Sequence, residues 1–367
     1  MKKILFVSNI PSPYMVDLVY NIQQTIENYQ VYALYTNKNE DNREWKIDND
    51  KLINTTVLQS KIIKIKTKLD YRYIHIPSNI FSYLFEIKPD IIFAWEYNIA
   101  AVQCLTWCKT NKKKFIHVTE GTINSEKNIW LIQKLTRKLI IKCADAYLAC
   151  STKAKEKLVS WGCEPKEVFL GLLTVDVSKY LEIERMFNSD IILYVGSFAK
   201  RKGLDLLIKA MKDIDQGILH IVGNGSEQDK SELQQIAKDN HVENRIVWCD
   251  YKHGNELIKE YMEAALFVLP TREDCFGLVL VEAMAAGLPI VSSKYADGAY
   301  DVIENGKNGV LVDPYTEEMA ININRIINDK SIQKSYSIYS RQHIDKFLYD
   351  EVVQNYNAVI CKMWDCE

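Results

Sequence analysis

Residues 271–293 read TREDCFGLVLVEAMAAGLPIVSS, and the order of residue types here indicates a loop, a buried helix and a buried strand. Charged residues open the stretch, and an apolar run follows from Leu278. Gly287 suits the position just past a helix, and Pro289 prevents the helix from continuing. The apolar residues up to Ser292 then predict a strand. One helix leading at once into a buried strand is typical of an α/β fold.

The same alternation of short apolar runs and helical segments extends along most of the chain. In the first half, the predicted strands are Ile4–Val7, Val31–Tyr35, Ile91–Trp95, Phe115–Val118 and Ala146–Ala149. In the second half, they are Ile191–Val195, Leu219–Val222, Ile246–Trp248, Leu266–Leu269, Ile290–Ser292 and Val310–Val312. Short runs without polar alternation suit parallel strands that are buried on both faces. Helices between them imply right-handed βαβ units and hence doubly wound sheets.

The chain is too long for one ordinary core, because it has 367 residues. The alternation breaks between Leu172 and Asp190. We therefore expect an N-terminal domain over residues 1–176, a C-terminal domain over 177–340, and a C-terminal helix over 341–367 that packs back on the first domain. The predicted fold is α/β, with two Rossmann-like doubly wound parallel-sheet domains that face a cleft. Ligands of such sheets bind beyond the carboxyl ends of the strands.

Composition excludes several classes of protein. The formal charge of −2 gives no global argument for nucleic acid, and we expect no nucleic-acid partner. Nine cysteines contain no C-x-x-C pair, which fits a reducing compartment better than a disulfide or zinc framework. The N-terminus MKKILFVSNIPSPY indicates a first strand rather than a signal peptide. No apolar stretch reaches about 18 residues, so we expect a cytoplasmic chain without a membrane span.

A basic loop follows one strand of the second half, in LYVGSFAKRKGLDLL at residues 193–207. Lys200, Arg201 and Lys202 precede a helix expected to begin near Gly203. Helix N-termini favour anions, and three cations strengthen that preference, so the loop is a candidate diphosphate site. The alternative is a solvated basic loop. The absence of G-x-x-x-x-G-K-[ST] argues against an ATPase.

Two glycine-containing stretches also follow strands. IVGNGS at 221–226 is a candidate phosphate-side turn, although a tight turn alone explains it equally well. It lacks the third glycine of a dinucleotide fingerprint, and the first strand enters SNIPSPY instead of such a loop, which argues against a Rossmann oxidoreductase. YADGAYDVIENGKNG at 295–309 lies at the same predicted edge of the sheet.

Two acids flank the start of the helix in the opening stretch. Asp274 lies just ahead of the helix, where a carboxylate meets free N–H groups. Glu282 lies about one turn into the helix, where an unpaired buried carboxylate is costly. Its partner is expected to be either a nearby Lys or Arg, or the hydroxyl groups of a ligand.

In the first half, FIHVTEGT at residues 115–122 carries a strand out to Glu120. Glu120 is placed to touch a reacting group or to orient a sugar hydroxyl. His117 lies three residues earlier, and a lone buried histidine is more often structural. The loops SNIPSPY at 8–14 and WEYN at 95–98 are further candidates for the wall of the cleft.

The second half resembles the GT-B glycosyltransferases of glycosyltransferase family 4. The motifs that carry the resemblance are GSFAKRKG at 196–203, GNG at 223–225, PTREDCFGLVLVEAMAAGLPI at 270–290 and DGAYDVIENGKNGVLVDP at 297–314. The resemblance covers residues 190–315 strongly and the first half in outline.

The resemblance implies roles for particular residues. Lys202 takes the position of a diphosphate-binding lysine, and Glu282 that of the acid that binds the ribose hydroxyls. Asp274 stands in place of a glutamate expected near the donor sugar, and Ser197 stands where the family usually has arginine. Glu120 lies near the position of a histidine or aspartate in many relatives. The catalytic candidates are thus Asp274, Glu120 and Lys202. The donor-binding candidates are Gly196, Ser197, Arg201, Lys202, Gly223, Asn224, Gly225, Asp274, Phe276, Gly277, Leu278 and Glu282.

The reaction implied by the resemblance is a retaining transfer from a nucleotide diphosphate sugar, with UDP as the common nucleotide, to a hydroxyl of a glycan or lipid-linked acceptor. Such transfers serve bacterial surface polysaccharide or glycoconjugate synthesis. No D-x-D stands at a clear strand end and no His/Cys cluster is evident, so we expect no metal and no cofactor. Closure over a hinge near 175–188 would exclude water. A sugar-nucleotide epimerase, a phosphorylase of the same architecture and a non-catalytic sugar-nucleotide-binding protein remain as alternatives.

The segment 127–144 carries five positive side chains and no acid. Lys134, Arg137, Lys138 and Lys142 are expected near one helical face. A solvated face is one interpretation. The other is peripheral contact with anionic lipid at the inner face of a membrane, which would fit a lipid-linked acceptor.

Overall fold

The computed structural model describes residues 1–40, 45–67, 69 and 71–364. The chain forms two compact units. The first comprises Met1–Thr67, Tyr71–Asp176 and the chain from Phe347 onward, and the second comprises Val177–Lys346. The return to the first unit thus starts at Phe347 rather than at residue 341, because a helix of the second unit continues to Gln342.

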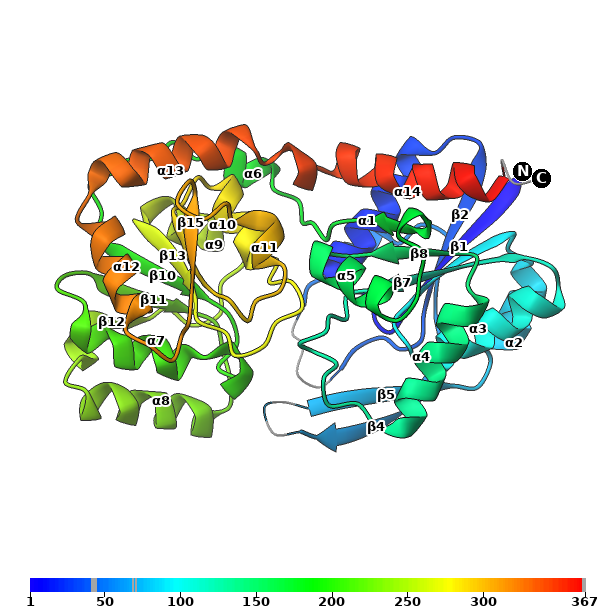
Figure 1. The fold of residues 1–367 in the computed structure, drawn as a ribbon, viewed down its shortest axis with the longest axis horizontal. Helices are drawn as coiled ribbons and strands as arrows, with labels where there is room; N and C mark the ends of the chain where they lie inside the picture. The colour runs from blue at the N-terminus through cyan, green and yellow to red at the C-terminus, as the bar shows by residue number, and fades with distance from the viewer. Residues whose placement is uncertain (41–44, 68, 70, 365–367) are drawn as a thin grey trace. The chain divides into compact units, whose positions relative to one another are not determined.

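The first unit contains a seven-stranded parallel sheet in the order β3-β2-β1-β6-β7-β8-β9. Its strands are β1 (Lys2–Ser8), β2 (Tyr29–Tyr35), β3 (Thr55–Val57), β6 (Ile91–Trp95), β7 (Lys114–Thr119), β8 (Ala146–Ala149) and β9 (Val168–Leu170). The helices of this unit are α1 (Pro13–Thr25), α2 (Ile80–Ile87), α3 (Ile99–Thr110), α4 (Leu131–Cys143), α5 (Thr152–Ser160) and α14 (Tyr349–Trp364), as Figure 1 shows. A Lys-rich strand, β4 (Ser60–Lys66), forms an antiparallel hairpin with β5 (Tyr71–Pro77).

The second unit contains a six-stranded parallel sheet in the order β12-β11-β10-β13-β14-β15. Its strands are β10 (Ile191–Val195), β11 (Ile218–Val222), β12 (Ile246–Trp248), β13 (Leu266–Leu269), β14 (Ile290–Ser293) and β15 (Gly309–Val312). Its helices are α6 (Ser178–Leu181), α7 (Leu204–Ala210), α8 (Glu227–Asp239), α9 (Asn255–Glu263), α10 (Val279–Ala285), α11 (Ala299–Val302), α12 (Glu318–Ile327) and α13 (Lys330–Gln342). The two doubly wound parallel sheets predicted from the sequence are confirmed.

The central strands are buried on both faces, which explains their lack of polar alternation. All five residues of β6 and all four of β13 are buried. In the second unit, α7, α8 and α12 contribute to one core against the sheet, and Figure 1 shows α9 and α10 on the other side. Helices on both faces leave the ends of the strands as the place where polar loops gather.

Each sheet has a point where its strand order reverses. In the first unit, β1 lies between β2 and β6, and in the second, β10 lies between β11 and β13. Ligands of open α/β sheets bind beyond the carboxyl ends of the strands at such a point. In the part of the chain that the structure describes, no helix has both the length and the apolar character required to cross a bilayer.

Candidate functional site

The site in the second unit is built at the strand-order reversal between β10 and β13. The basic loop follows β10, and the acidic loop that carries Asp274 follows β13. These strands pair in parallel, with Ile192 opposite Leu266. Their carboxyl ends therefore bring together two motifs about 70 residues apart in the sequence.

Gly203 allows these two loops to touch. Its φ is +72°, and a Cβ at this position would lie 2.1 Å from the carbonyl oxygen of Pro270. The backbone N–H of Arg272 donates to the carbonyl of Arg201 at 2.8 Å. The guanidinium of Arg272 also forms two hydrogen bonds with the Asp205 carboxylate, at 2.6 and 2.7 Å. The acidic loop is thus held against the basic loop and against α7, which begins directly after Gly203 as predicted.

The second motif packs on the first in the same way. A Cβ on Gly223 would lie 1.9 Å from the carbonyl oxygen of Gly196, so the two backbones cross at a distance that only glycine permits. The N–H of Phe198 donates to the carbonyl of Asn224 at 2.9 Å. Ser197 accepts a hydrogen bond at its backbone carbonyl from the buried Tyr194 hydroxyl, at 2.8 Å. The two loops are therefore in direct backbone contact, and Gly225 lies against the Phe198 side chain. We call these two loops the donor-side surface.

An ion pair between Lys202 and Asp274 joins the basic loop to the acidic loop. The ammonium Nζ lies 2.6 Å from Oδ2 of Asp274, and Arg201 lies 3.8 Å from Oδ1. Burial raises the pKa of Asp274, but Lys202 and Arg201 outweigh it, so the pKa is lowered and the carboxylate is charged. The sequence predicted both residues at a donor site but did not predict that they bond to each other.

Asp274 also connects the third motif to the fourth. Its N–H donates to the carbonyl of Tyr295 at 3.1 Å, and its carbonyl accepts from the N–H of Asp297 at 2.9 Å. Its carboxylate accepts a hydrogen bond from the backbone N–H of Phe276, close to the helix start, as expected for an acid just ahead of a helix. Phe276 itself is buried. Direct backbone contacts and hydrogen bonds therefore connect all four motifs.

Glu282 has partners that the sequence analysis missed. The Tyr261 hydroxyl donates to Oε2 at 2.7 Å, and the Tyr180 hydroxyl bonds the same carboxyl. Burial raises the pKa of Glu282 to about 7, although both tyrosines act to lower it. Among the described residues, no Lys or Arg forms an ion pair with it, so the alternative of a salt bridge is not observed there. The tyrosines come from α9 and α6, which nothing in the sequence pattern links to the helix α10.

In α10, the predicted residues lie where the sequence placed them. Gly277 precedes the helix with a φ of +83°, and Leu278 is its N-cap. The helix ends at Ala285, and Gly287 follows with a φ of +68°. A seven-residue helix with this start places Glu282 in its first turn.

A second polar group lies at the carboxyl edge of the sheet in the first unit, around Glu120. Glu120 directly follows β7 and is partly exposed. The Tyr14 hydroxyl donates to its Oε1 at 3.0 Å. Its backbone N–H donates to Oε1 of Glu96 at 2.6 Å, and Thr119 donates to the same carboxylate. Glu96 has a φ of +61°, a rare conformation for a residue with a side chain, and it follows β6.

His117 does not share this edge. It is completely buried, and its ring packs against that of Tyr97 at 4.3 Å between centroids. Burial, and then the positive charges of Lys157 and Arg137, lower the pKa of His117 well below its ordinary value, so the ring is neutral. Of the two candidates on this strand, Glu120 is the one that reaches the surface.

Behind this edge lies a buried charge cluster that the sequence analysis missed. Arg137 donates two hydrogen bonds to Glu126, at 2.8 and 2.7 Å, and Lys157 lies 2.8 Å from the same carboxylate. Lys157 is only 1% exposed. The prediction that Arg137 belongs to an exposed basic face is therefore wrong, because Glu126 draws it inward. The other three basic residues of the predicted face, Lys134, Lys138 and Lys142, are exposed.

Among the residues that the structure describes, the fold assembles one group of metal-ligand residue types, although none was evident in the sequence. Donor atoms of His220, Cys249 and Glu260 all lie within 4.8 Å of one another. The Lys252 ammonium also donates a hydrogen bond to the Glu260 carboxylate, so the negative charge of Glu260 is balanced without a metal ion. These residues lie apart from the Lys202–Asp274 pair in the sequence, and the expectation of a metal-independent reaction stays a prediction.

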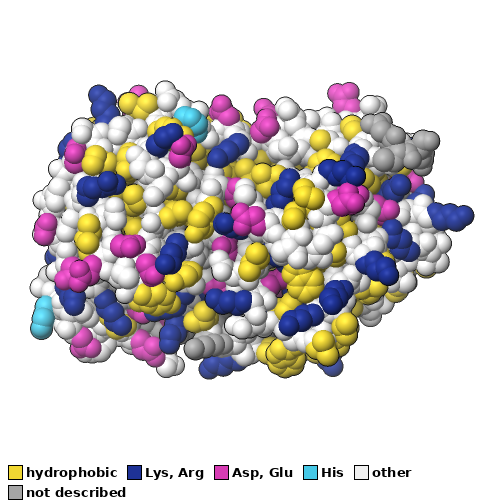
Figure 2. Space-filling view, viewed as in Figure 1, with side chains coloured by type: hydrophobic (Ala, Val, Ile, Leu, Met, Phe, Trp, Pro, Cys, Tyr) yellow, Lys and Arg dark blue, Asp and Glu magenta, His cyan; other side chains and the backbone are white. Residues whose placement is uncertain are grey.

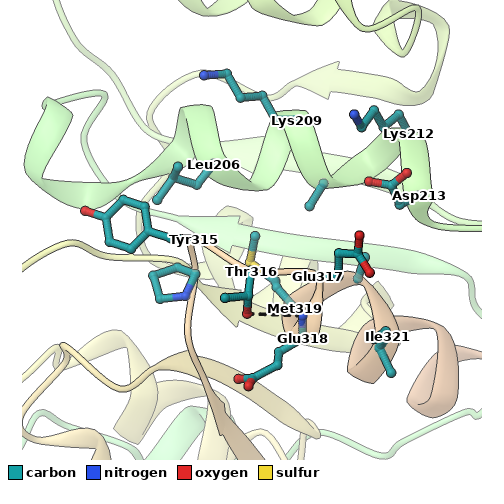
Figure 3. A pocket seen from close by; sticks show the side chains of 13 residues that line it. Leu206, Lys209, Lys212, Asp213, Tyr315, Thr316, Glu317, Glu318, Met319 and Ile321 are labelled. Carbon is teal, nitrogen blue, oxygen red and sulfur yellow. Dashed lines mark hydrogen bonds between the residues drawn. The ribbon is translucent and has the colours of Figure 1, made fainter.

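A hollow of about 700 Å³ on the second unit does not coincide with the donor-side surface. It lies between α7 and the start of α12, and its lining includes Lys209, Lys212, Tyr315 and Glu318. Figure 3 shows that Lys209 and Lys212 extend to the side away from Glu318. No predicted site residue lines this hollow, and its charged groups do not converge.

Comparison with known proteins relates the chain to one family model and to several solved structures. Residues 182–343 match the family described as Glycosyl transferases group 1. An uncharacterized glycosyltransferase of Methanocaldococcus jannaschii is 28% identical over 46% of this chain and 43% of its own length, so less than half of that relative is represented. The lipopolysaccharide 1,6-galactosyltransferase of Salmonella typhimurium is 24% identical over 76% of this chain and 78% of its own. The structure of Anabaena HepE in complex with UDP superposes with a TM-score of 0.78 at 17% identity, covering 99% of this chain and 100% of that one.

The two parallel sheets and the superposition on HepE show that the chain has the GT-B fold. The match to the glycosyl transferases group 1 lies within the second unit of this fold.

Proposed function

We propose that this protein transfers a glycosyl group from a nucleotide diphosphate sugar, with UDP as the nucleotide, to a hydroxyl of a glycan or lipid-linked acceptor. The anomeric carbon loses its bond to the diphosphate oxygen and gains a bond to the acceptor oxygen, with retention of configuration. The resemblance to family 4 supports retention. The Salmonella relative named for lipopolysaccharide galactosyl transfer and the UDP complex of HepE support the acceptor and donor classes.

The observation that carries the proposal is the Lys202–Asp274 pair at the strand-order reversal of the second sheet. An ammonium has three N–H donors, and Asp274 takes one of them. We propose that the others bind the diphosphate, and that Asp274 holds the lysine in position for this contact. Arg201 adds a second fixed cation at the same place and compensates for the arginine missing at Ser197.

Fixed cations at this place serve the difficult part of the reaction. Negative charge grows on the diphosphate as it leaves, and groups already in position stabilise that charge without further reorganisation. Lys202 and Arg201 supply this stabilisation with no metal in the proposed mechanism.

We assign Glu282 to the ribose. A carboxylate has about four lone-pair positions, and the two tyrosines occupy only part of that capacity. Because its pKa is about 7, hydroxyl groups that donate to the charged form favour ionisation when the nucleotide binds. Nucleotide binding is then coupled to the release of a proton near neutral pH.

Glu120 is our candidate for contact with the acceptor or the reacting group. The Tyr14 hydroxyl donates to the Glu120 carboxylate, and the Glu120 backbone N–H donates to the Glu96 carboxylate. These hydrogen bonds hold Glu120 at the edge of the first sheet, next to Glu96 with its positive φ. We propose that Glu120 contributes to transfer and not to nucleotide binding.

Calorimetric titration with UDP tests the donor assignment. Lys202→Met is expected to weaken UDP binding by about tenfold or more, since a charge-assisted hydrogen bond to phosphate contributes roughly 1.5–3 kcal/mol. Lys212→Met removes an exposed lysine of the same unit and is the matched control, with binding unchanged. Failure of the unmodified protein to bind UDP, UDP-sugars or GDP-sugars would exclude the proposal.

Transfer of a labelled sugar from the donor found in this way tests the reaction itself. Glu120→Gln is expected to lower the transfer rate while UDP affinity stays constant. Conversion of the donor sugar in the absence of any acceptor would identify an epimerase instead. Unchanged transfer in the presence of EDTA is the result expected for a metal-independent enzyme.

A further inference from the structure

The helix α4 exposes an unusual amount of apolar surface. Five apolar side chains at the start of the helix and along one side of it are largely exposed. Their exposed fractions are 76% for Trp130, 73% for Leu131, 70% for Ile132, 57% for Leu135 and 48% for Leu139. Single exposed apolar residues are common, but a contiguous group on one helix indicates a binding surface. Together with Lys134, Lys138 and Lys142, these residues form what we call the α4 outer face.

The outer face consists of two parallel rows. Leu131, Leu135 and Leu139 recur every four residues and line one row. Lys134, Lys138 and Lys142 recur at the same interval and line the neighbouring row, and all three are exposed. Figure 2 shows hydrophobic and dark-blue basic side chains together over this region. The apolar row and the basic row therefore point to the same side of the helix.

The inner face of α4 is firmly anchored, so the outer face is not simply a poorly packed core. Ile140 is completely buried, and Ile141 is nearly so. Arg137 reaches inward to its two hydrogen bonds with Glu126. A helix fixed on one side in this way presents the opposite side as a rigid surface.

The charge of the outer face is of one sign. From residue 127 to residue 144 the sequence contains no acid. Within the described part of the chain, no carboxylate forms an ion pair with Lys134, Lys138 or Lys142. Amphipathic helices with exposed leucines, a tryptophan and adjacent lysines lie in the interface of anionic bilayers, because the apolar residues enter the boundary while the lysines stay near the lipid headgroups.

We propose that the α4 outer face binds the surface of a bilayer rich in anionic lipid. Charge complementarity favours this occupant over a second copy of the chain. In a two-fold contact, both copies would bring their lysine rows into one interface, and this stretch of helix offers no acid to pair with them, so like charges would oppose the contact. A bilayer instead offers negative charge to the basic row and hydrocarbon to the apolar row.

Co-sedimentation with vesicles tests this surface. The intact chain is expected to bind vesicles of phosphatidylglycerol and phosphatidylcholine in equal parts, to release them at high salt, and not to bind pure phosphatidylcholine. Lys134→Gln with Lys138→Gln should lower binding by roughly 25-fold, at about fivefold for each lysine. Leu131→Ser with Leu135→Ser should lower it by at least about tenfold.

The control is Lys209→Gln with Lys212→Gln, which changes the net charge equally on the second unit and should bind as the unmodified protein does. Thermal unfolding of each variant establishes that it is folded. Binding of no vesicles, or equal binding by the α4 variants, would overturn the proposal. A dimer in solution that Leu135→Ser converts to a monomer would do the same, because a second copy would then cover the face. No sugar donor is needed for these measurements, so their outcome is independent of the proposed function.

Discussion

Replacement of Glu282 by glutamine is expected to stabilise the protein above neutral pH. Its carboxyl is partly buried between two tyrosine hydroxyls, and burial raises its pKa to about 7 from an ordinary value of 4.5. Between these two pH values the folded protein binds a proton that the unfolded chain does not. Stability contributed by the neutral carboxyl is therefore fully present below about pH 4.5 and is lost as the pH rises through 7.

The size of this effect follows from the change in pKa. One pKa unit corresponds to about 1.4 kcal/mol, so the rise from 4.5 to about 7 corresponds to roughly 3 kcal/mol at pH 8. Glutamine keeps the shape and an acceptor oxygen but carries no charge. Since 1 kcal/mol shifts the melting temperature of a unit of this size by about 2–4 °C, the gain at pH 8 should be several degrees.

Thermal unfolding of the intact chain at a series of pH values from 5 to 8 measures this gain. The difference in melting temperature between Glu282→Gln and the unmodified protein should increase with pH. Asp274→Asn is the matched control, because the pKa of Asp274 is lowered and its charge is paired with Lys202. That variant should be destabilised by a nearly constant amount over the same range. A pH-independent difference for Glu282→Gln, or a loss of stability at pH 8, would refute the reasoning.

Two further substitutions test the contacts that assemble the two polar edges. Gly203→Ala would place a Cβ 2.1 Å from the Pro270 carbonyl oxygen at a φ of +72°. This variant should lower the free energy of unfolding of the second unit in urea by about 2–3 kcal/mol. The control is Gly306→Ala, which has a φ of +81° but no atom within reach of the Cβ and should lower it by only about 1 kcal/mol. Equal effects would exclude the close approach as the cause. Glu126→Gln leaves the buried Arg137 and Lys157 without their carboxylate, so it should lower the free energy of unfolding in urea by about 3–5 kcal/mol. The control is Glu156→Gln, which removes a surface ion pair and should change that free energy by less than about 1 kcal/mol. A small effect of Glu126→Gln would mean that water or another acid compensates the buried charges.

Much of the fold and part of the site can be predicted from the sequence, because they depend on local signals. Every strand predicted from an apolar run is present, including Ile91–Trp95 and Leu266–Leu269 with the same bounds. Gly287 and Pro289 end the helix α10 as local stereochemistry requires. The strands β3, β9 and β5 escaped prediction. β3 and β9 have three residues each and lie at the edges of the first sheet, and β5 lies outside the main sheets in a hairpin with alternating residue types.

The partners of the charged residues were decided by the tertiary structure. The sequence indicated that Lys202, Asp274 and Glu282 belong to one site, but the Lys202–Asp274 pair exists only because β10 and β13 are neighbours. Helical periodicity in the sequence predicted that Arg137 lies on an exposed face. In the structure Arg137 is buried, because it pairs with the largely buried Glu126. The periodicity of a helix specifies which residues share a side. Which side is buried, and which distant carboxylate or hydroxyl meets a given charge, depends on packing between segments far apart in the chain.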